Sequence, residues 1–314
     1  MSEESELVKA ILDLKQESNP VKDYIYPLLI TSLAAFLGLF SVKYQKYIDA
    51  QKEKLEVANN WVVSFQSAFE GLISIKRTYK GKLSECPLQR TSAVQEIIHS
   101  ATKIDLDLGG LSFLVPEKSD YEALEDKWRS LPRINSMKKN YNFLIETWGK
   151  RNSHAAKIIP KIIKSHGENG VADISFPQIL ECVGEEEFLP YMDLTEYAIK
   201  MTDELLIEMY DFISNFGKSA KECIDIFRVR SFGQILSYKN ENQEVKDCLE
   251  KSPELNYTLL SQLFNIPEDH LRKKYQTGYE DLEYVEQKVK DPIVENIRNF
   301  KERERLKKKH RKWW

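Results

Sequence analysis

The sequence predicts an all-α protein with an N-terminal single transmembrane helix that continues into a long rod helix, which packs in a cytosolic helical bundle. Three observations lead to this prediction. Residues 24–42 carry no charge, although charged residues make up 30% of the 314-residue chain and the mean hydropathy is −0.48. A four-three apolar repeat follows directly, and further amphipathic helical patterns fill the body without a Gly/Ser linker or an internal repeat. We divide the chain into a leader (1–22), an anchor (23–43), a stalk (44–80), a bundle (81–290) and a basic tail helix (291–314).

The uncharged segment YIYPLLITSLAAFLGLFSV has the length of a bilayer. As a helix its nineteen residues span about 28 Å. Tyr24 and Tyr26 at one end and Lys43 at the other are residue types found at membrane interfaces. Ala34 and Gly38 form a small-xxx-small pair, a pattern that lets two anchors approach closely. A cleaved signal peptide and a buried core helix are the alternatives, but the acidic leader lacks the basic start of a signal peptide.

The flanks of the anchor place the bulk of the chain in the cytoplasm. The leader, an expected short amphipathic helix, holds Lys9, Lys15 and Lys22, whereas four lysines follow the anchor between residues 43 and 54. The side richer in lysine and arginine is the cytoplasmic one. Four cysteines without CxxC spacing are typical of free thiols in a reducing compartment. We therefore predict a single-pass protein of the plasma or inner membrane.

The stalk carries an uninterrupted heptad-like stripe. The stripe has eleven positions, and all but Gln51 and Lys76 are apolar or aromatic: Tyr44, Ile48, Gln51, Leu55, Ala58, Val62, Phe65, Phe69, Leu72, Lys76 and Tyr79. Up to Leu55 the stripe is narrow, as in a coiled coil between chains. From Val57 onward it widens, which favours packing within the chain.

The body reads as a bundle of long helices. We expect a loop from Gly81 to Arg90, helices near 92–106, 121–163 and 189–215, and shorter helical pieces between 220 and 284. Pro132 should break the second helix, Gly217 should end the third, and Ser252 with Pro253 should start a later one. The apolar connector 109–119 is expected to be buried and extended, and residues 166–177 to form a loop.

One polar cluster interrupts the stripe of the second helix. Arg151 and His154 are three residues apart and share a helical face, with Asn152 between them. The run RNSH resembles the Arg-His motif of the HEPN ribonuclease superfamily, all-helical proteins that act on RNA. The resemblance covers these four residues only, and the family usually places four to six residues between Arg and His, where this chain has two. It implies catalytic roles for Arg151 and His154. The other interpretation is a semi-buried Arg151 paired with a carboxylate of a facing helix.

No other pattern in the sequence indicates an enzyme. Gly217, Lys218 and Ser219 match only the end of a phosphate-binding loop, and no strand precedes them. The run from Glu181 to Glu187 reads as a solvated acidic segment rather than a metal site. We therefore expect no cofactor and no metal, and an enzyme is not the favoured interpretation.

The tail contrasts with the acidic body. Residues 297–314 hold nine lysines or arginines against two glutamates, which leaves a net charge of −10 on the rest of a chain whose total is −3. A basic run of this kind binds anionic lipid or nucleic acid, and an indole pair favours the membrane interface. The candidate binding residues are Lys307, Lys308, Lys309, Arg311, Lys312, Trp313 and Trp314.

Three functions remain open from the sequence. The first is a membrane-anchored helical interaction or effector protein, of the toxin-like or phage-defence kind, acting with a companion protein or as a homo-oligomer. The second is a membrane-tethered ribonuclease that uses Arg151 and His154. The third is a tether that holds nucleic acid at the membrane through the basic tail.

Overall fold

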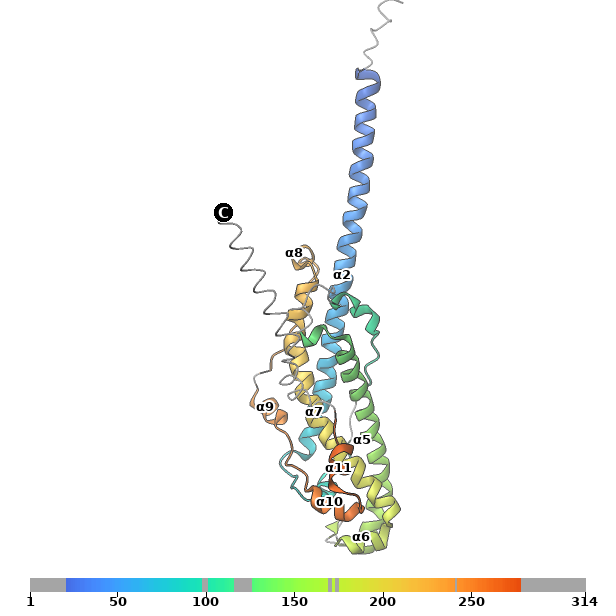
Figure 1. Ribbon diagram of the computed structural model, residues 1–314, viewed down its shortest axis with the longest axis vertical. Helices are drawn as coiled ribbons and strands as arrows, with labels where there is room; N and C mark the ends of the chain where they lie inside the picture. The colour runs from blue at the N-terminus through green and yellow to red at the C-terminus, as the bar shows by residue number, and fades with distance from the viewer. Residues whose placement is uncertain are drawn as a thin grey trace, which may run out of the picture. The chain divides into compact units, whose positions relative to one another are not determined.

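The structure, a computed structural model, describes residues 21–97, 101–115, 126–168, 171–172, 175–240 and 242–277. These residues form an all-α fold apart from a two-residue antiparallel pairing of β1 (Gly167–Glu168) with β2 (Val171–Ala172). The long helices are α2 (Tyr26–Tyr79), α5 (Leu131–His166) and α7 (Glu185–Cys223) (Figure 1). The short ones are the π-helical turn η1 (Val21–Ile25), the 3-10 helices η2 (Leu108–Leu114) and η3 (Lys127–Arg129), and α3 (Pro87–Ala93), α6 (Phe176–Val183), α8 (Ile226–Val229), α9 (Gln243–Leu249), α10 (Tyr257–Phe264) and α11 (Glu268–Lys274). The leader up to residue 20 and the tail from 278 lie outside the described residues.

The chain divides into two compact units. Among the described residues, the first unit contains the chain up to Glu56 together with Ile224–Gln234. The second unit contains Val57–Cys223 and the chain from Ile235 onward. Helix α2 supplies residues to both units.

Helix α2 is a single helix of 54 residues without an internal break. Ten of the eleven positions of the predicted stripe are buried, from Ile48 to Tyr79, and Tyr44 is exposed. Within the second unit the stripe packs on aromatic side chains: the ring of Phe65 lies 4.7 Å from that of Phe212, and the ring of Tyr79 lies 6.0 Å from that of Trp148. The widening of the stripe after Val57 therefore corresponds to packing within the chain.

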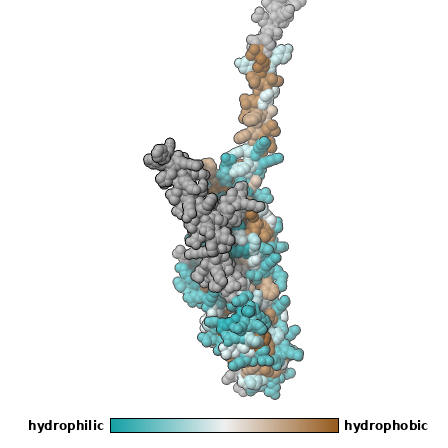
Figure 2. Space-filling view, in the orientation of Figure 1, coloured by the Kyte–Doolittle hydropathy of each residue, from teal (hydrophilic) through white to brown (hydrophobic). Residues whose placement is uncertain are grey.

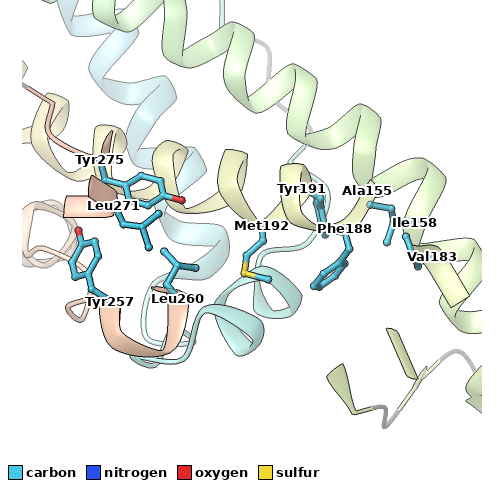
Figure 3. Packing of buried hydrophobic residues seen from close by; sticks show 10 residues of the cluster. All are labelled: Ala155, Ile158, Val183, Phe188, Tyr191, Met192, Tyr257, Leu260, Leu271 and Tyr275. Atoms are coloured by element: carbon cyan, nitrogen blue, oxygen red, sulfur yellow. The ribbon is translucent and has the colours of Figure 1, made fainter. Parts of the chain in front are cut away.

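Helices α5 and α7 run antiparallel and side by side through the second unit. The stripe predicted for the second long helix is buried in α5, at Ile134, Met137, Tyr141, Leu144, Trp148, Arg151, Ala155 and Ile158. Helix α7 is buried around most of its circumference, so it also carries polar residues that the fold must satisfy. At the lower end of the unit, α10 and α11 cover α7 and extend the apolar core (Figure 3). Figure 3 shows Tyr257 and Leu260 of α10, Leu271 of α11 and Tyr275 directly after α11, together with Met192 of α7.

The chain after α3 departs most from the sequence prediction. A helix was expected at 92–106, but α3 ends at Ala93, and residues 94–97 and 101–107 are not helical. Asn152 of α5 exchanges hydrogen bonds of 2.7 and 3.3 Å with the backbone of Ile97, and Asn142 exchanges bonds of 2.9 and 2.8 Å with that of Ile104. A side-chain amide has both a donor and an acceptor, so it replaces a neighbouring peptide group. The segment therefore needs no helix to satisfy its backbone.

The structure also tests the predicted boundaries around α3, α5 and the connector between them. The expected loop to Arg90 is partly helical, because α3 starts at Pro87. The predicted break at Pro132 agrees with the structure, because α5 begins at Leu131 and Pro132 lies in its first turn, where its missing N–H costs nothing. The predicted connector 109–119 is described up to residue 115; it is buried at Leu111 and Leu114, as expected, but residues 109–114 belong to the 3-10 helix η2 instead of an extended segment.

Gly217 does not end the third long helix, because α7 continues to Cys223. A Cβ at Gly217 would lie 2.7 Å from the backbone oxygen of Leu236, so the glycine allows that segment to approach α7 closely. Ser252 and Pro253 precede no helix directly. Helix α10 starts at Tyr257 and is capped by Asn256, whose side chain accepts a hydrogen bond from the N–H of Leu259 (2.9 Å).

Candidate functional sites

The predicted anchor is an exposed apolar helix surface in the first unit. Its large side chains from Leu28 to Val42 are 55–67% exposed, and Figure 2 shows the hydrophobic colour along this part of the helix. The 54-residue helix α2 contains an 18-residue window with a mean hydropathy of 1.5, none of which is buried. Among the described residues it is the one helix long and apolar enough to cross a membrane.

The predicted anchor residues lie on the surface of the first unit. Tyr24 and Tyr26 are 73% and 58% exposed, and Ala34, Gly38 and Lys43 are also exposed. A Cβ placed on Gly38 would meet no atom within 4 Å. The small-residue pair is thus accessible to another helix.

The polar side chain of Thr31 is satisfied within the helix itself. Its hydroxyl donates to the carbonyl oxygens of Pro27 (2.8 Å) and Leu28 (3.1 Å). A hydroxyl bonded to the preceding turn needs no water, so it is compatible with an apolar solvent around the helix.

Arg151 is completely buried in the second unit, at 0% exposure. Its guanidinium donates hydrogen bonds to three backbone carbonyls and two hydroxyls, those of Thr91, Val94, Gln95, Tyr191 and Thr195. The ring of Tyr191 lies 4.8 Å from the guanidinium carbon. Burial lowers the pKa of Arg151 from its usual value, while Tyr191 opposes this shift.

These contacts differ from the partner expected from the sequence. A carboxylate of a facing helix was the predicted partner, but the hydrogen-bond acceptors within the described part of the chain are carbonyl and hydroxyl oxygens. With Asn152 bonded to Ile97, the two neighbouring residues of α5 fasten the non-helical segment 94–97 to the helix. Their role in this structure is to satisfy backbone groups.

The Arg-His pair gains no support as a catalytic site. Arg151 has no exposed surface on which a phosphate could dock, while His154, one turn further along α5, is only partly buried. A general acid or base must reach the atom that it protonates or deprotonates. The ribonuclease hypothesis thus stays an untested prediction.

A polar pocket in the second unit brings together residues that the sequence did not nominate. It has a volume of about 520 Å³ and is lined by α3, α7, residues 251–255, α10 and α11 with the residues that follow it. Arg90 and Glu196 form a buried ion pair at its wall, with 2.7 Å between Nε and Oε2. Arg90 also donates to the carbonyl oxygens of Pro253 (2.7 Å) and Ser84 (3.2 Å).

These contacts give a hydrogen-bond partner to only one of the two carboxylate oxygens of Glu196. Its Oε1 atom is buried without a hydrogen-bond partner among the described residues. Burial raises the pKa of Glu196 to about 7, although Arg90 acts in the opposite direction. A group that changes charge near neutral pH inside a pocket is a candidate for binding or sensing.

A second buried charge network lies beside this pocket. Lys76 of α2 forms an ion pair with Asp203 of α7 and donates to the hydroxyl of Ser252 (3.0 Å). The N–H of Ser252 in turn donates to Asp203 (2.7 Å). Ser252, expected at a helix start, therefore joins the loop after α9 to two long helices.

One signal in the sequence could have identified these residues. Glu196 and Asp203 are seven residues apart, so they lie on the same face of α7, beside further charged residues such as Lys200 and Glu204. Lys76 occupies an apolar position of the stalk stripe. A charge inside an apolar stripe requires a buried partner, but the partner itself cannot be found from local spacing.

Other predicted sites can be placed only in part. The four cysteines are free thiols, and Sγ of Cys182 lies 3.3 Å from Nδ1 of His166. No group of three or more His, Cys, Asp or Glu side chains suited to a metal ion occurs within the residues that the structure describes. The basic tail and its candidate residues Lys307 to Trp314 lie outside the described residues.

Over the residues that the structure describes, the chain is all-α apart from one short strand pair, with one apolar helix long enough to span a membrane and a helical unit that holds buried charge networks. No protein-family model matches the chain, and no curated protein or solved structure matches it either.

Proposed function

We propose that the chain is a single-pass membrane protein whose helical unit acts in the cytoplasm as an interaction or effector module together with a protein partner or a second copy. The observation that carries this proposal is the exposed apolar half of α2, in which every large side chain from Leu28 to Val42 is more than half exposed. A continuous apolar surface of this kind is unfavourable in water and favourable in a bilayer.

The lysine distribution supports the cytoplasmic orientation of the helical unit. Lys43, Lys46, Lys52 and Lys54 follow the apolar segment closely, and the cysteines of the helical unit are free thiols. In this orientation, protease added outside intact cells leaves the helical unit whole. Its degradation would contradict the orientation but not the anchor.

The polar pocket supports the interaction role of the helical unit. Its Glu196 has an unused acceptor, and a pocket of about 520 Å³ falls in the size range of small-molecule sites. A partner or ligand that donates a hydrogen bond to Oε1 of Glu196 would supply the acceptor's missing partner. The helical unit would then link recognition in the pocket to action at the membrane.

The anchor is tested by placing charge in it. In the double variant Leu33→Arg/Leu37→Arg, each arginine at the centre of the span costs about 2.5 to 3.5 kcal/mol of insertion free energy. We expect the wild type to stay in the membrane fraction after alkaline carbonate extraction and the double variant to leave it. The matched control Leu33→Ile/Leu37→Ile keeps the apolar surface and should behave as the wild type.

The effector role is tested by measuring membrane permeability in cells that overexpress the wild type or the arginine variant. Overexpression of the wild type should make the membrane permeable to a dye that intact cells exclude, and the arginine variant should not. A wild type found in the soluble fraction would contradict the anchor. Membrane-bound protein that leaves dye exclusion unchanged would contradict a membrane-permeabilising effector while leaving the anchor intact.

A further inference from the structure

The first unit holds a surface that the sequence did not reveal, formed by α8 and the start of the polar half of α2. Two hydrogen bonds attach the α8 segment to α2 close to the end of the apolar stretch. The hydroxyl of Tyr47 donates to Oδ2 of Asp225 (3.2 Å), and the N–H of Asp225 donates to Oε1 of Gln51 (3.0 Å). The α8 segment is therefore held at the level of these helix turns.

Aromatic rings and guanidinium groups alternate on this surface. The guanidinium of Arg228 lies 5.5 Å from the ring centre of Tyr44 and 5.2 Å from that of Tyr47. Arg230 lies 4.6 Å from the ring of Phe227. At 74% exposure, Phe227 is the most exposed large apolar side chain that the structure describes. An exposed phenylalanine beside two arginines is typical of a surface that contacts something both apolar and anionic.

The position along α2 indicates what this surface contacts. Tyr44 and Tyr47 follow Val42, the last residue of the uncharged segment, by two and five residues, or about 3 to 8 Å along the helix axis. The headgroup layer on each side of a bilayer core is about 5 to 8 Å thick. When the apolar segment spans the core, Arg228 of α8, which lies against the rings of Tyr44 and Tyr47, is therefore at the depth of the lipid headgroups, while Asp225 at Gln51 lies further from the core.

The charge at this level is positive. Residues 43–49 and 224–230 contain four basic side chains, Lys43, Lys46, Arg228 and Arg230, against the two carboxylates of Asp49 and Asp225. Anionic headgroups attract such residues, and tyrosine and phenylalanine partition to the boundary between headgroups and acyl chains.

We propose that Phe227, Arg228 and Arg230 of the α8 segment, together with Lys43 and Lys46 of α2, form a headgroup surface that binds anionic phospholipid. The proposal rests on the proposed membrane anchor, because the depth of α8 follows from the span. It adds a contact with lipid chemistry to an anchor that by itself requires only an apolar core. Phe227 inserts its ring among the acyl chains, and the arginines bind phosphate oxygens with their N–H groups.

The test uses the full chain in two kinds of lipid nanodisc, one of phosphatidylcholine alone and one that also contains phosphatidylglycerol. Amide hydrogen exchange, read by mass spectrometry, reports the protection of residues 226–232 and, as an internal reference, of α9. We expect slower exchange at 226–232 only in the discs with phosphatidylglycerol, and equal exchange at α9 in both.

Two variants make the test specific. The double variant Arg228→Gln/Arg230→Gln should lose the lipid-dependent protection, by about fivefold for each arginine removed, while it enters the discs as the wild type does. Phe227→Ser should weaken the protection without changing its dependence on phosphatidylglycerol. The variant Arg77→Gln, with a partly exposed arginine in the part of α2 that belongs to the second unit, is the matched control and should keep the protection.

The outcomes separate this inference from the proposed function. Incorporation into both discs with equal exchange at 226–232 overturns the headgroup surface and leaves the anchor intact. Retained protection in the double arginine variant also overturns it. Failure of the wild type to enter either disc overturns the anchor itself and, with it, the depth on which the headgroup surface depends.

Discussion

The exposed apolar half of α2 and the buried charges of the second unit are opposite departures from the usual distribution of side chains. In the first region, the large apolar side chains from Leu28 to Val42 are exposed, although apolar side chains are usually buried. In the second, charged groups such as Arg151, Glu196 and Asp203 are buried. Each of these groups has a hydrogen-bond partner within the second unit, although Oε1 of Glu196 has none among the described residues. Within the described residues nothing covers the exposed apolar surface, which is long enough to span a membrane.

The largest expected effect concerns Arg151. Arg151→Ala leaves the carbonyls of the 91–95 segment without their buried donor, and we expect the free energy of unfolding to fall by about 3 to 5 kcal/mol. Urea denaturation of the full chain in detergent micelles, followed by tryptophan fluorescence, measures it. The control His154→Ala, on the same helix face, should change the value by less than about 1 kcal/mol. Equal small effects of both variants would contradict the structural role of Arg151.

The two halves of α2 can be compared by making the same change, leucine to alanine, once in each half. Leu72 is 0% exposed and Leu33 is 59% exposed. Leu72→Ala should lower the free energy of unfolding by about 2 to 5 kcal/mol because it leaves a cavity, whereas Leu33→Ala in detergent should change it by about 0.5 kcal/mol or less. The same denaturation experiment applies. A similar loss for both would show that the apolar half packs against another part of the chain, and the comparison would fail.

The smallest expected effect is the pH dependence that Glu196 introduces. Its pKa in the folded chain is about 7, above the ordinary 4.5, because burial outweighs the attraction of Arg90. The folded chain therefore holds this proton more tightly than the unfolded chain does. The contribution of the protonated Glu196 to the free energy of unfolding is complete below pH 4.5. It is lost as the pH rises through 7, and the free energy of unfolding then falls by at most about 1.4 kcal/mol per pH unit.

Substitution of Glu196 checks this sign. Glu196→Gln should remove the fall in the free energy of unfolding between pH 5 and 7, which is measured by urea denaturation at a series of pH values. The control Glu187→Gln alters an exposed carboxyl whose pKa is lowered by Lys161, so it should leave this window unchanged. Burial raises the pKa of Tyr275, and Asp193 and Glu196 raise it further, so Tyr275 stays protonated throughout. An unchanged slope in Glu196→Gln would exclude this residue as the source.

Long periodic segments were the most predictable part of the fold. The stripe of α5 and most of the stripe of α2 are buried as predicted, because apolar residues that recur every three or four positions can be buried together only on one face of a helix. The prediction failed at residues 94–97 and 101–106, where Val94, Ile97 and Ile104 also follow helical spacing. There, asparagine side chains of α5 satisfy the backbone, and that requires contacts between distant parts of the chain.

The sequence alone determined the features that depend on local composition: the helical character of the chain, the length of its uncharged segment and the basic character of its tail. An uncharged run and a periodic stripe can be recognised from neighbouring residues. Only the tertiary structure decided that Arg151 is buried under backbone carbonyls, that Glu196 lines a pocket with one oxygen unpaired, and that α8 lies beside Tyr44 and Tyr47. Those partners are 40 to 184 residues apart in the chain, so no local pattern brings them together.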